Sequence, residues 1–297
     1  MSMDLLIEKI RAKNNPTVAG LDPKIEYVPR YIIDKNYSIY GKNIKTVIES
    51  IFEFNKGLID ALCDIVPAVK PQSAYYEMLG YHGAKLLDRT VQYAKEKGLY
   101  VICDVKRNDI GSTAAAYAEG YFDKDGYNVN SITVNAYLGS DGIEPFKKYC
   151  DESDKSIFVL VKTSNPSSGE LQDLRLENGE TIYEHMADMV SCWGENSIGK
   201  SGYSNVGAVV GATYPHQLTE LRERMPHAFF LVPGYGAQGA TARDIAGAFD
   251  KSGVGAIVNS SRGIMCAYKN SGTSEQNYAQ AARDEAIRMR DEILSVL

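Results

Sequence analysis

The stretch Val101-Ile-Cys-Asp-Val-Lys-Arg-Asn-Asp-Ile-Gly-Ser-Thr113 runs from apolar residues through a cluster of charges into an alanine-rich segment. If residues 100–106 form a β-strand, alternate side chains point to opposite faces of the sheet. Asp104 and Lys106 then share one face, so a carboxylate and an ammonium stand side by side at the carboxyl end of the strand. The opposite face consists of Val101, Cys103 and Val105. Because that face is apolar, we expect a helix to cover it.

An aspartate and a lysine at a strand end are often no more than a solvated salt bridge. Two further features of the sequence favour an active site. Asp109 follows at a short Gly-Ser-Thr turn, and Lys70 occupies the same strand-exit position in Ala68-Val-Lys-Pro-Gln-Ser73. Several charged strand ends in one chain indicate the rim of an active site.

The composition is that of a globular protein with ample core: 297 residues, 44% apolar and 24% charged. The formal net charge of −6 predicts no nucleic-acid partner, because nucleic-acid binders carry a basic face. Residues 1–13 mix charged residues with leucine and isoleucine, unlike a signal peptide, and no apolar run is long enough to span a membrane. We therefore expect a cytoplasmic protein without a membrane partner.

The cysteines are scattered along the chain without a Cys-x-x-Cys spacing. They are Cys63, Cys103, Cys150, Cys192 and Cys266. This pattern predicts reduced, mostly buried thiols and no structural metal.

Apolar runs alternate with helical patterns along the chain. The predicted strands are residues 17–22, a run that ends at Lys70, and residues 100–106, 131–137, 157–164, 206–212, 229–232 and 256–259. Helical patterns follow at residues 43–62, 83–97, 112–121, 141–150, 181–197, 215–224, 242–251 and 274–294. Because each return between parallel strands needs a crossover helix, the alternation predicts a parallel sheet. Eight repeats predict a single (β/α)8 TIM barrel domain over residues 1–297, with an extra N-terminal helix from Asp4 to Ala12.

An open, doubly wound sheet is the alternative fold, but no Gly-x-Gly-x-x-Gly follows the first strand. Two segments interrupt the alternation. Residues 24–42 contain several tyrosines without a clear period, and we interpret them as an insertion in the first loop. Residues 165–180 form a long polar loop, which we expect to act as a lid.

The loops after the last two strands predict a phosphate site, which (β/α)8 barrels often build there. The loop Pro233-Gly-Tyr-Gly-Ala-Gln-Gly239 is rich in glycine, so its backbone N–H groups can approach an anion, and it contains Gln238. Arg262 lies beside Gly263 in the next loop, and a guanidinium can bind phosphate through two parallel hydrogen bonds. The glycines alone could serve only tight turns, but together with Arg262 they favour a phosphate clamp.

Two other strand ends carry polar residues that have two interpretations. Asp22 precedes Pro23, where it either forms a turn or binds a sugar hydroxyl. Ser164 ends the fifth predicted strand, where a Ser/Asn turn accounts for the local sequence but not for the length of the loop that follows.

Asp104-x-Lys106-x-x-Asp109-Ile110 with Thr113, preceded by Lys70, resembles the signature of the orotidine 5'-phosphate decarboxylase family. Further segments resemble the longer-chain bacterial-type branch of that family, in the same order. They are Gly20-Leu-Asp22-Pro23, Val69-Lys-Pro-Gln-Ser73, Thr163-Ser-Asn-Pro166, Pro233-Gly-Tyr-Gly-Ala-Gln-Gly239 and Ser261-Arg-Gly263. A wider barrel superfamily uses Asp-x-Lys-x-x-Asp for other sugar-phosphate chemistry. Lys70, Gln238 and Arg262 narrow the resemblance to the decarboxylase.

The resemblance implies that orotidine 5'-phosphate is converted to uridine 5'-phosphate and carbon dioxide in de novo pyrimidine biosynthesis, without a metal or an organic cofactor. It implies that Lys106 donates a proton to C6 and that Asp104 lies against the substrate carboxylate. Lys70 would bridge Asp104 and the ribose. The chemistry suits these residue types, because loss of carbon dioxide leaves negative charge at C6, which a fixed ammonium stabilises and then protonates.

The resemblance also implies the substrate contacts and a homodimer. The binding residues would be Asp22 for a ribose hydroxyl, Ser164 for the pyrimidine, and Gln238 and Arg262 for the phosphate. Asp109, with Thr113 beside it, would reach into the active site of the other subunit.

Two other functional classes compete with the decarboxylase. Lys162 also lies at a strand exit with the predicted inward parity of Ser164, as a Schiff-base aldolase requires, although we favour a solvated strand-end lysine there. A noncatalytic nucleotide-binding barrel would keep the phosphate clamp, but it has no use for Asp104, Lys106 and Asp109 together.

Overall fold

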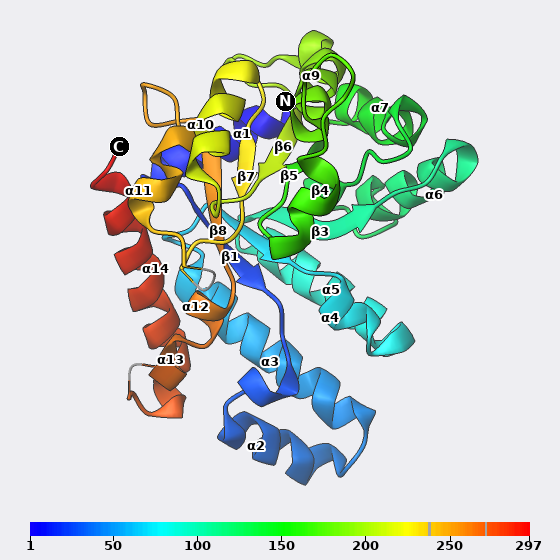
Figure 1. Cartoon of the computed structure of the whole chain (residues 1–297). Coiled ribbons are helices and arrows are strands. Elements are labelled where there is room, and N and C mark those ends of the chain that lie inside the picture. The colour runs from blue at the N-terminus through cyan, green and yellow to red at the C-terminus, as the bar shows by residue number, and fades with distance from the viewer. Residues whose placement is uncertain (237–238, 271) are drawn as a thin grey trace.

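The computed structural model describes residues 1–236, 239–270 and 272–297. Within these ranges, eight parallel strands close into a barrel in the order of the chain (Figure 1). The strands are β1 (Thr17–Leu21), β2 (Ala68–Pro71), β3 (Tyr100–Arg107), β4 (Ser131–Val134), β5 (Ser156–Lys162), β6 (Val206–Val210), β7 (Phe230–Val232) and β8 (Ala256–Ser260). The predicted (β/α)8 TIM barrel is confirmed, and the open doubly wound sheet is ruled out.

Helices connect successive strands around the outside of the barrel (Figure 1). The longer ones are α1 (Ser2–Lys13), α2 (Arg30–Tyr40), α3 (Ile44–Leu62), α5 (Gly80–Glu96), α6 (Gly111–Phe122), α7 (Glu144–Glu152), α9 (Ile182–Gly194), α10 (Pro215–Arg224) and α14 (Tyr278–Leu294). The short ones are α4 (Ala74–Glu77), α8 (Gly169–Gln172), α11 (Ala242–Ile245), α12 (Arg262–Met265) and α13 (Ala267–Asn270). The helix expected over residues 242–251 is therefore shorter than predicted. It gives way to a 3-10 turn at Gly247, where an added Cβ would lie 2.1 Å from the Thr219 hydroxyl.

Residues 24–42 contain the regular helix α2, which packs on α3 (Figure 1). Its apolar period is weak because only Ile32 and Asn36 of this helix are buried. Asn36 donates a hydrogen bond to Glu53 of α3 at 3.1 Å, and Lys35 forms an ion pair with the same carboxylate at 2.8 Å. Polar contacts thus help to hold α2 against α3, a role that an apolar stripe has in other helices.

The strand that contains the central charges alternates as predicted. Ile102 belongs to the apolar cluster inside the barrel, whereas Val101, Cys103 and Val105 pack with the surrounding helices. The barrel cluster is closed at the end where the strands begin by α1, whose contributing residues are Met3, Leu6, Ile7 and Ile10. The extra N-terminal helix is therefore the floor of the barrel core.

Two glycines allow neighbouring strand exits to approach closely. A Cβ on Gly20 of β1 would lie 1.9 Å from the Ser261 hydroxyl, which follows β8. A Cβ on Gly211, after β6, would lie 2.8 Å from the backbone nitrogen of Ser164, which follows β5. Both glycines therefore allow two segments at the ends of neighbouring strands to lie in contact.

Two strand exits are irregular. The pairing of β3 with β4 shifts between Cys103 and Arg107, and the pairing of β5 with β6 shifts between Leu160 and Lys162. Within the first irregularity, Lys106 adopts a positive φ of 47°. Bulges of this kind change the direction in which side chains point.

None of the helices within the described ranges combines the length and the apolar character that crossing a membrane requires.

We predict that truncating Leu6 will destabilise the protein because its side chain is fully buried in the barrel floor. Leu6→Ala should lower the free energy of unfolding by about 2–5 kcal/mol, the usual cost of such a cavity. The matched control is Leu5→Ala, because Leu5 is 39% exposed on the same helix and its loss should cost less than about 0.5 kcal/mol. Urea titrations of both variants measure the difference, and equal effects would show that α1 does not seal the core.

Candidate active site

Among the described residues, two adjoining cavities that contain the predicted site residues open at the carboxyl ends of the strands. The first, of about 460 Å³, is lined by Lys70, Asp104, Lys106, Thr133, Leu160, Thr163, Ser164, Asn165, Gln172, Val209, Leu231 and Pro233. The second, of about 210 Å³, is lined by Asp22, Tyr27, Lys70, Tyr75, Asp104, Pro233, Gly234, Tyr235, Asn259, Ser260, Ser261 and Arg262. Lys70, Asp104 and Pro233 line both, so the two cavities adjoin at these residues.

Asp104 is the centre of the polar contacts at this junction. Its Oδ2 accepts a hydrogen bond from Lys70 Nζ at 2.8 Å, and its Oδ1 accepts one from Lys106 Nζ at 2.6 Å. The Thr133 hydroxyl on β4 donates a further bond to Oδ1 at 2.8 Å. Lys70 and Asp104 are buried, whereas the Lys106 side chain is 47% exposed and faces the first cavity.

The charges of this cluster stabilise one another. Burial alone would raise the pKa of Asp104, but the charges of Lys70 and Lys106 and their hydrogen bonds outweigh it, so the pKa lies well below its usual range. Burial alone would lower the pKa of Lys70, but the carboxylates of Asp104 and Asp22 reverse the effect and raise it. Asp104 and Lys70 are therefore both ionised at neutral pH.

The second cavity offers acceptors to a ligand. Asp22 Oδ1 and Asn259 Oδ1 are buried and have no hydrogen-bond partner among the described residues. A buried oxygen without a partner in the protein is available to a hydroxyl donor. This arrangement favours the sugar-ligand interpretation of Asp22 over a simple turn.

Arg262 lies at the mouth of the second cavity, exposed, at the start of α12. No hydrogen bond or ion pair from another described residue occupies its guanidinium. Gln238, the other predicted phosphate ligand, lies outside the described residues.

Ser164 lines the first cavity, two residues beyond the end of β5. The Thr213 hydroxyl donates to its carbonyl at 3.3 Å, and Gln172 holds the preceding residue. The Gln172 side chain accepts a bond from the Thr163 backbone at 3.0 Å and donates to the Thr163 hydroxyl at 2.7 Å. The loop after β5 is thus fastened at the cavity wall.

Asp109 and Thr113 are not among the described residues that line the two cavities. Asp109 Oδ1 accepts a bond from the backbone of Ile110 at 2.9 Å, and Thr113 is exposed on the first turn of α6. Within one chain, therefore, the structure does not bring them to Lys106.

Lys162 corrects two expectations. It does not share the inward parity of Ser164, and it is not solvated: its side chain is fully buried. Its ammonium lies 2.5 Å from Asp173 and between the rings of Tyr183 and Tyr214. The register shift in β5, which the sequence did not reveal, turns this side chain out of the barrel.

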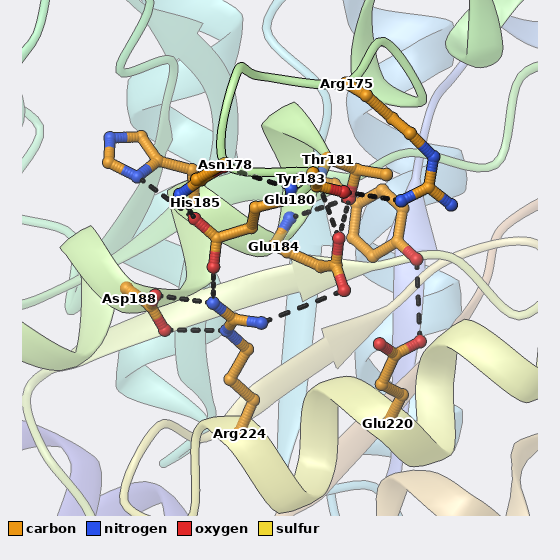
Figure 2. A network of polar contacts seen from close by, with 11 residues as sticks. Arg175, Asn178, Glu180, Thr181, Tyr183, Glu184, His185, Asp188, Glu220 and Arg224 are labelled. Atoms are coloured by element: carbon orange, nitrogen blue, oxygen red, sulfur yellow. Dashed lines mark hydrogen bonds and ion pairs between the residues drawn. The ribbon is translucent and has the colours of Figure 1, made fainter.

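The segment from 165 to 180 is not an irregular loop. It contains α8, and Arg175 pairs with Thr181 in an antiparallel bridge. Arg224 of α10 binds Glu180 and also Asp188 of α9, the latter through two hydrogen bonds of 2.6 Å (Figure 2). The far half of the segment is therefore tied to α9 and α10, and its role as a lid stays a prediction.

Several residues that line the cavities were not predicted from the sequence, and three of them are polar residues of particular interest. Thr133, Gln172 and Asn259 occupy positions where a polar side chain lies inside the barrel or over its mouth. Strand parity could have identified two of them, because alternate residues of a strand point to the same face. Thr133 lies two residues after Ser131, and Asn259 lies two residues after Ile257, which is inside the barrel. Gln172 had no such signal because it belongs to a loop.

No cluster of three or more His, Cys, Asp or Glu side chains that could hold a metal ion is found within residues 1–236, 239–270 and 272–297.

The fold and the site define the chain as a (β/α)8-barrel enzyme with a lysine–aspartate–lysine cluster at the mouth of the barrel. Residues 50–276 match the model described as "Orotidine 5'-phosphate decarboxylase / HUMPS family". The chain belongs to this family, which confirms the resemblance drawn from its motifs.

Named relatives match nearly the whole chain. Orotidine 5'-phosphate decarboxylase of Rhodopirellula baltica is 45% identical over 286 residues, covering 93% of this chain and 93% of the relative. That of Clostridium tetani is 41% identical over 297 residues, covering 100% and 99%. The solved structure of Leishmania donovani OMP decarboxylase is similar with a TM-score of 0.77 at 31% identity, covering 99% of this chain and 98% of that one.

We predict that Asp104→Asn will destabilise the protein because it leaves buried Lys70 without its charged partner 2.8 Å away. The free energy of unfolding at pH 7 should fall by about 3 kcal/mol. Since folding lowers the pKa of Asp104, its contribution is present above the ordinary carboxyl pKa of about 4 and is lost as the pH falls below that value.

Urea titrations of the wild type and of Asp104→Asn measure this dependence. The difference between the two proteins should be the same at about pH 7 and pH 5 and should shrink at about pH 3.5, where the carboxylate of the unfolded wild-type chain begins to protonate while that of the folded protein stays ionised. A difference that does not change with pH would contradict the proposed ionisation of Asp104.

Proposed function

We propose that this chain decarboxylates orotidine 5'-phosphate to uridine 5'-phosphate and carbon dioxide, in pyrimidine biosynthesis and in the cytoplasm. The observation that carries the proposal is the Lys70–Asp104–Lys106 cluster, in which a half-exposed ammonium faces a cavity beside a buried carboxylate. The names of relatives at 45% and 41% identity support the same substrate. The residues 1–297 would act as one domain.

Lys106 is the proposed proton donor. Decarboxylation breaks the bond between C6 and the carboxyl carbon and leaves the electron pair on C6. An ammonium fixed beside C6 stabilises that charge and then delivers a proton to the same carbon. The ion pair with Asp104 supports this role because it holds Lys106 Nζ at one point of the cavity wall. This route needs no metal and no organic cofactor.

The two cavities fit the two halves of a nucleotide. In our proposal the pyrimidine occupies the first cavity beside Ser164, and its carboxylate lies against Asp104. The ribose and phosphate occupy the second, where Asp22 accepts a hydroxyl and Arg262 binds phosphate. Lys70 lies at the junction and would bridge Asp104 and the ribose. Gln238 would be a second phosphate ligand.

We propose further that the active site is completed by a second copy of the chain, with Asp109 and Thr113 supplied across the interface. Large apolar side chains are exposed on the segments that adjoin the Asp109 loop: Met78, Tyr81, Ile110, Tyr117, Tyr137 and Leu138. Arg107 links two of these segments, because it binds Glu77 of α4 and Tyr121 of α6. Such an apolar surface is typical of a protein–protein interface.

The position of Lys162 argues against the Schiff-base aldolase alternative. Lys162 is buried outside the barrel and is not among the described residues that line either cavity. A Schiff base requires a lysine that reaches the substrate carbonyl. We therefore expect borohydride to trap no adduct at Lys162. The Lys106–Asp104 pair argues against a noncatalytic nucleotide-binding barrel, because binding alone does not require this pair.

We predict that Lys106→Ala will abolish turnover. The loss of absorbance of orotidine 5'-phosphate should slow by at least about 10³-fold, because the variant lacks both the stabilising charge and the proton. Wild-type turnover should survive EDTA. The control is Lys124→Ala, which removes an exposed lysine on the turn after α6 and should keep wild-type activity. Full activity of folded Lys106→Ala would exclude Lys106 as the donor.

We predict that two inactive variants will complement each other. If Lys106 and Asp109 in one site come from different subunits, a Lys106→Ala/Asp109→Ala mixed dimer contains one intact site. When the variants exchange subunits freely, half of the dimers are mixed and half of their sites are intact, so activity should return to about a quarter of the wild-type value. The measurement is the rate before and after mixing and refolding. No recovery from mixed dimers would place Asp109 in the site of its own chain.

A further inference from the structure

The hydroxyl of Thr133 has an unusual number of contacts with the strand beside it. Thr133 lies on β4 and is 1% exposed. Its Oγ1 donates to Asp104 Oδ1 at 2.8 Å and accepts bonds from the backbone nitrogens of Val105 and Lys106, both at 2.9 Å. Since a hydroxyl has one donor and two acceptor sites, its whole hydrogen-bonding capacity is directed at three consecutive residues of β3.

These contacts occur where the regular pairing of β3 with β4 is interrupted. The register runs from Cys103↔Ile132 to Arg107↔Val134, so β3 has more residues than β4 in this interval. The backbone N–H groups in a bulge need acceptors other than the usual strand carbonyls. For Val105 and Lys106, the side chain of Thr133 supplies that acceptor.

The hydrogen bond from the Lys106 backbone nitrogen to Thr133 also restrains a residue with a strained backbone. Lys106 has a φ of 47°, a left-handed conformation that a non-glycine residue adopts only when its surroundings enforce it. The bond from its backbone nitrogen to Thr133 is one such constraint, and the ion pair of its ammonium with Asp104 is another. Thr133 therefore contacts both ends of the Asp104–Lys106 pair, at the carboxylate and at the backbone.

We propose that Thr133 is a positioning residue of the active site, whose hydroxyl sets the location of the Lys106 ammonium relative to Asp104. This inference rests on the proposed function, in which Lys106 protonates C6. Thr133 transfers no proton to the substrate in this account. It acts through the bulge of β3, because without its hydroxyl the bulge loses its acceptor and Asp104 keeps only its two lysines.

The test compares variants that separate the hydroxyl from the shape of the side chain. Thr133→Val keeps the branched shape without the hydroxyl, Thr133→Ala removes both, and Thr133→Ser keeps only the hydroxyl. We expect Thr133→Val and Thr133→Ala to lower kcat by about 100-fold, as small misplacements of catalytic groups do, while KM changes less than about threefold. Thr133→Ser should retain kcat within about threefold of the wild type.

Hydrogen exchange of the amides of Val105 and Lys106 gives a readout that is independent of activity. These amides should be protected in the wild type and in Thr133→Ser, and they should exchange faster in the folded hydroxyl-free variants. If Thr133→Val does not fold, Thr133→Ala and Thr133→Ser still provide the comparison with and without the hydroxyl.

Two results would overturn the proposal: wild-type kcat in a folded hydroxyl-free variant, or an equal loss of kcat in Thr133→Ser and Thr133→Ala. Failure of the proposed function would differ from both, because the wild type itself would not convert orotidine 5'-phosphate. In that event faster exchange at residues 105 and 106 would still assign the hydroxyl to the bulge, without a role in this reaction.

Discussion

The buried carboxylate of Asp104 must be balanced by positive charge, and the rest of the site is arranged around this requirement. Lys70 and Lys106 provide the charge from two neighbouring strand exits, with contacts of 2.8 and 2.6 Å. Removing Asp104 leaves the buried ammonium of Lys70 without its partner, which costs several kcal/mol. The same arrangement holds an ammonium at the wall of a cavity, so the interaction that stabilises the site also prepares the proposed proton donor.

The fold was predictable because its signals are local and repeated. The alternation of Ile102 and Asp104 with Val101 and Cys103 requires only the period of a strand, and eight such runs separated by helices leave few topologies. The helix over residues 30–40 was missed because its contact with α3 buries only Ile32 and Asn36. A stripe of two residues produces no periodicity that can be recognised.

The site was predictable only in part, because strand parity fails where a strand bulges. Asp22, Lys70, Asp104, Lys106, Ser164 and Arg262 all line the two cavities. Lys162 has the right sequence position for the same mouth, yet a register shift against β6 turns it outward. The contacts of Thr133 depend equally on register, in this case on the pairing of β4 with the irregular end of β3. The pairing register of two strands depends on both of them, so it cannot be predicted from the sequence of either strand alone.

In the proposed reaction, the carboxyl group at C6 of orotidine 5'-phosphate is replaced with a proton from the Lys106 ammonium, whose hydrogens exchange with solvent. The most direct measurement is proton NMR of the product formed by the purified protein in D2O. We expect uridine 5'-phosphate that carries deuterium at C6, and no such product from Lys106→Ala. Unchanged substrate with the folded wild type, or a product cleaved at another bond, would contradict the proposed reaction.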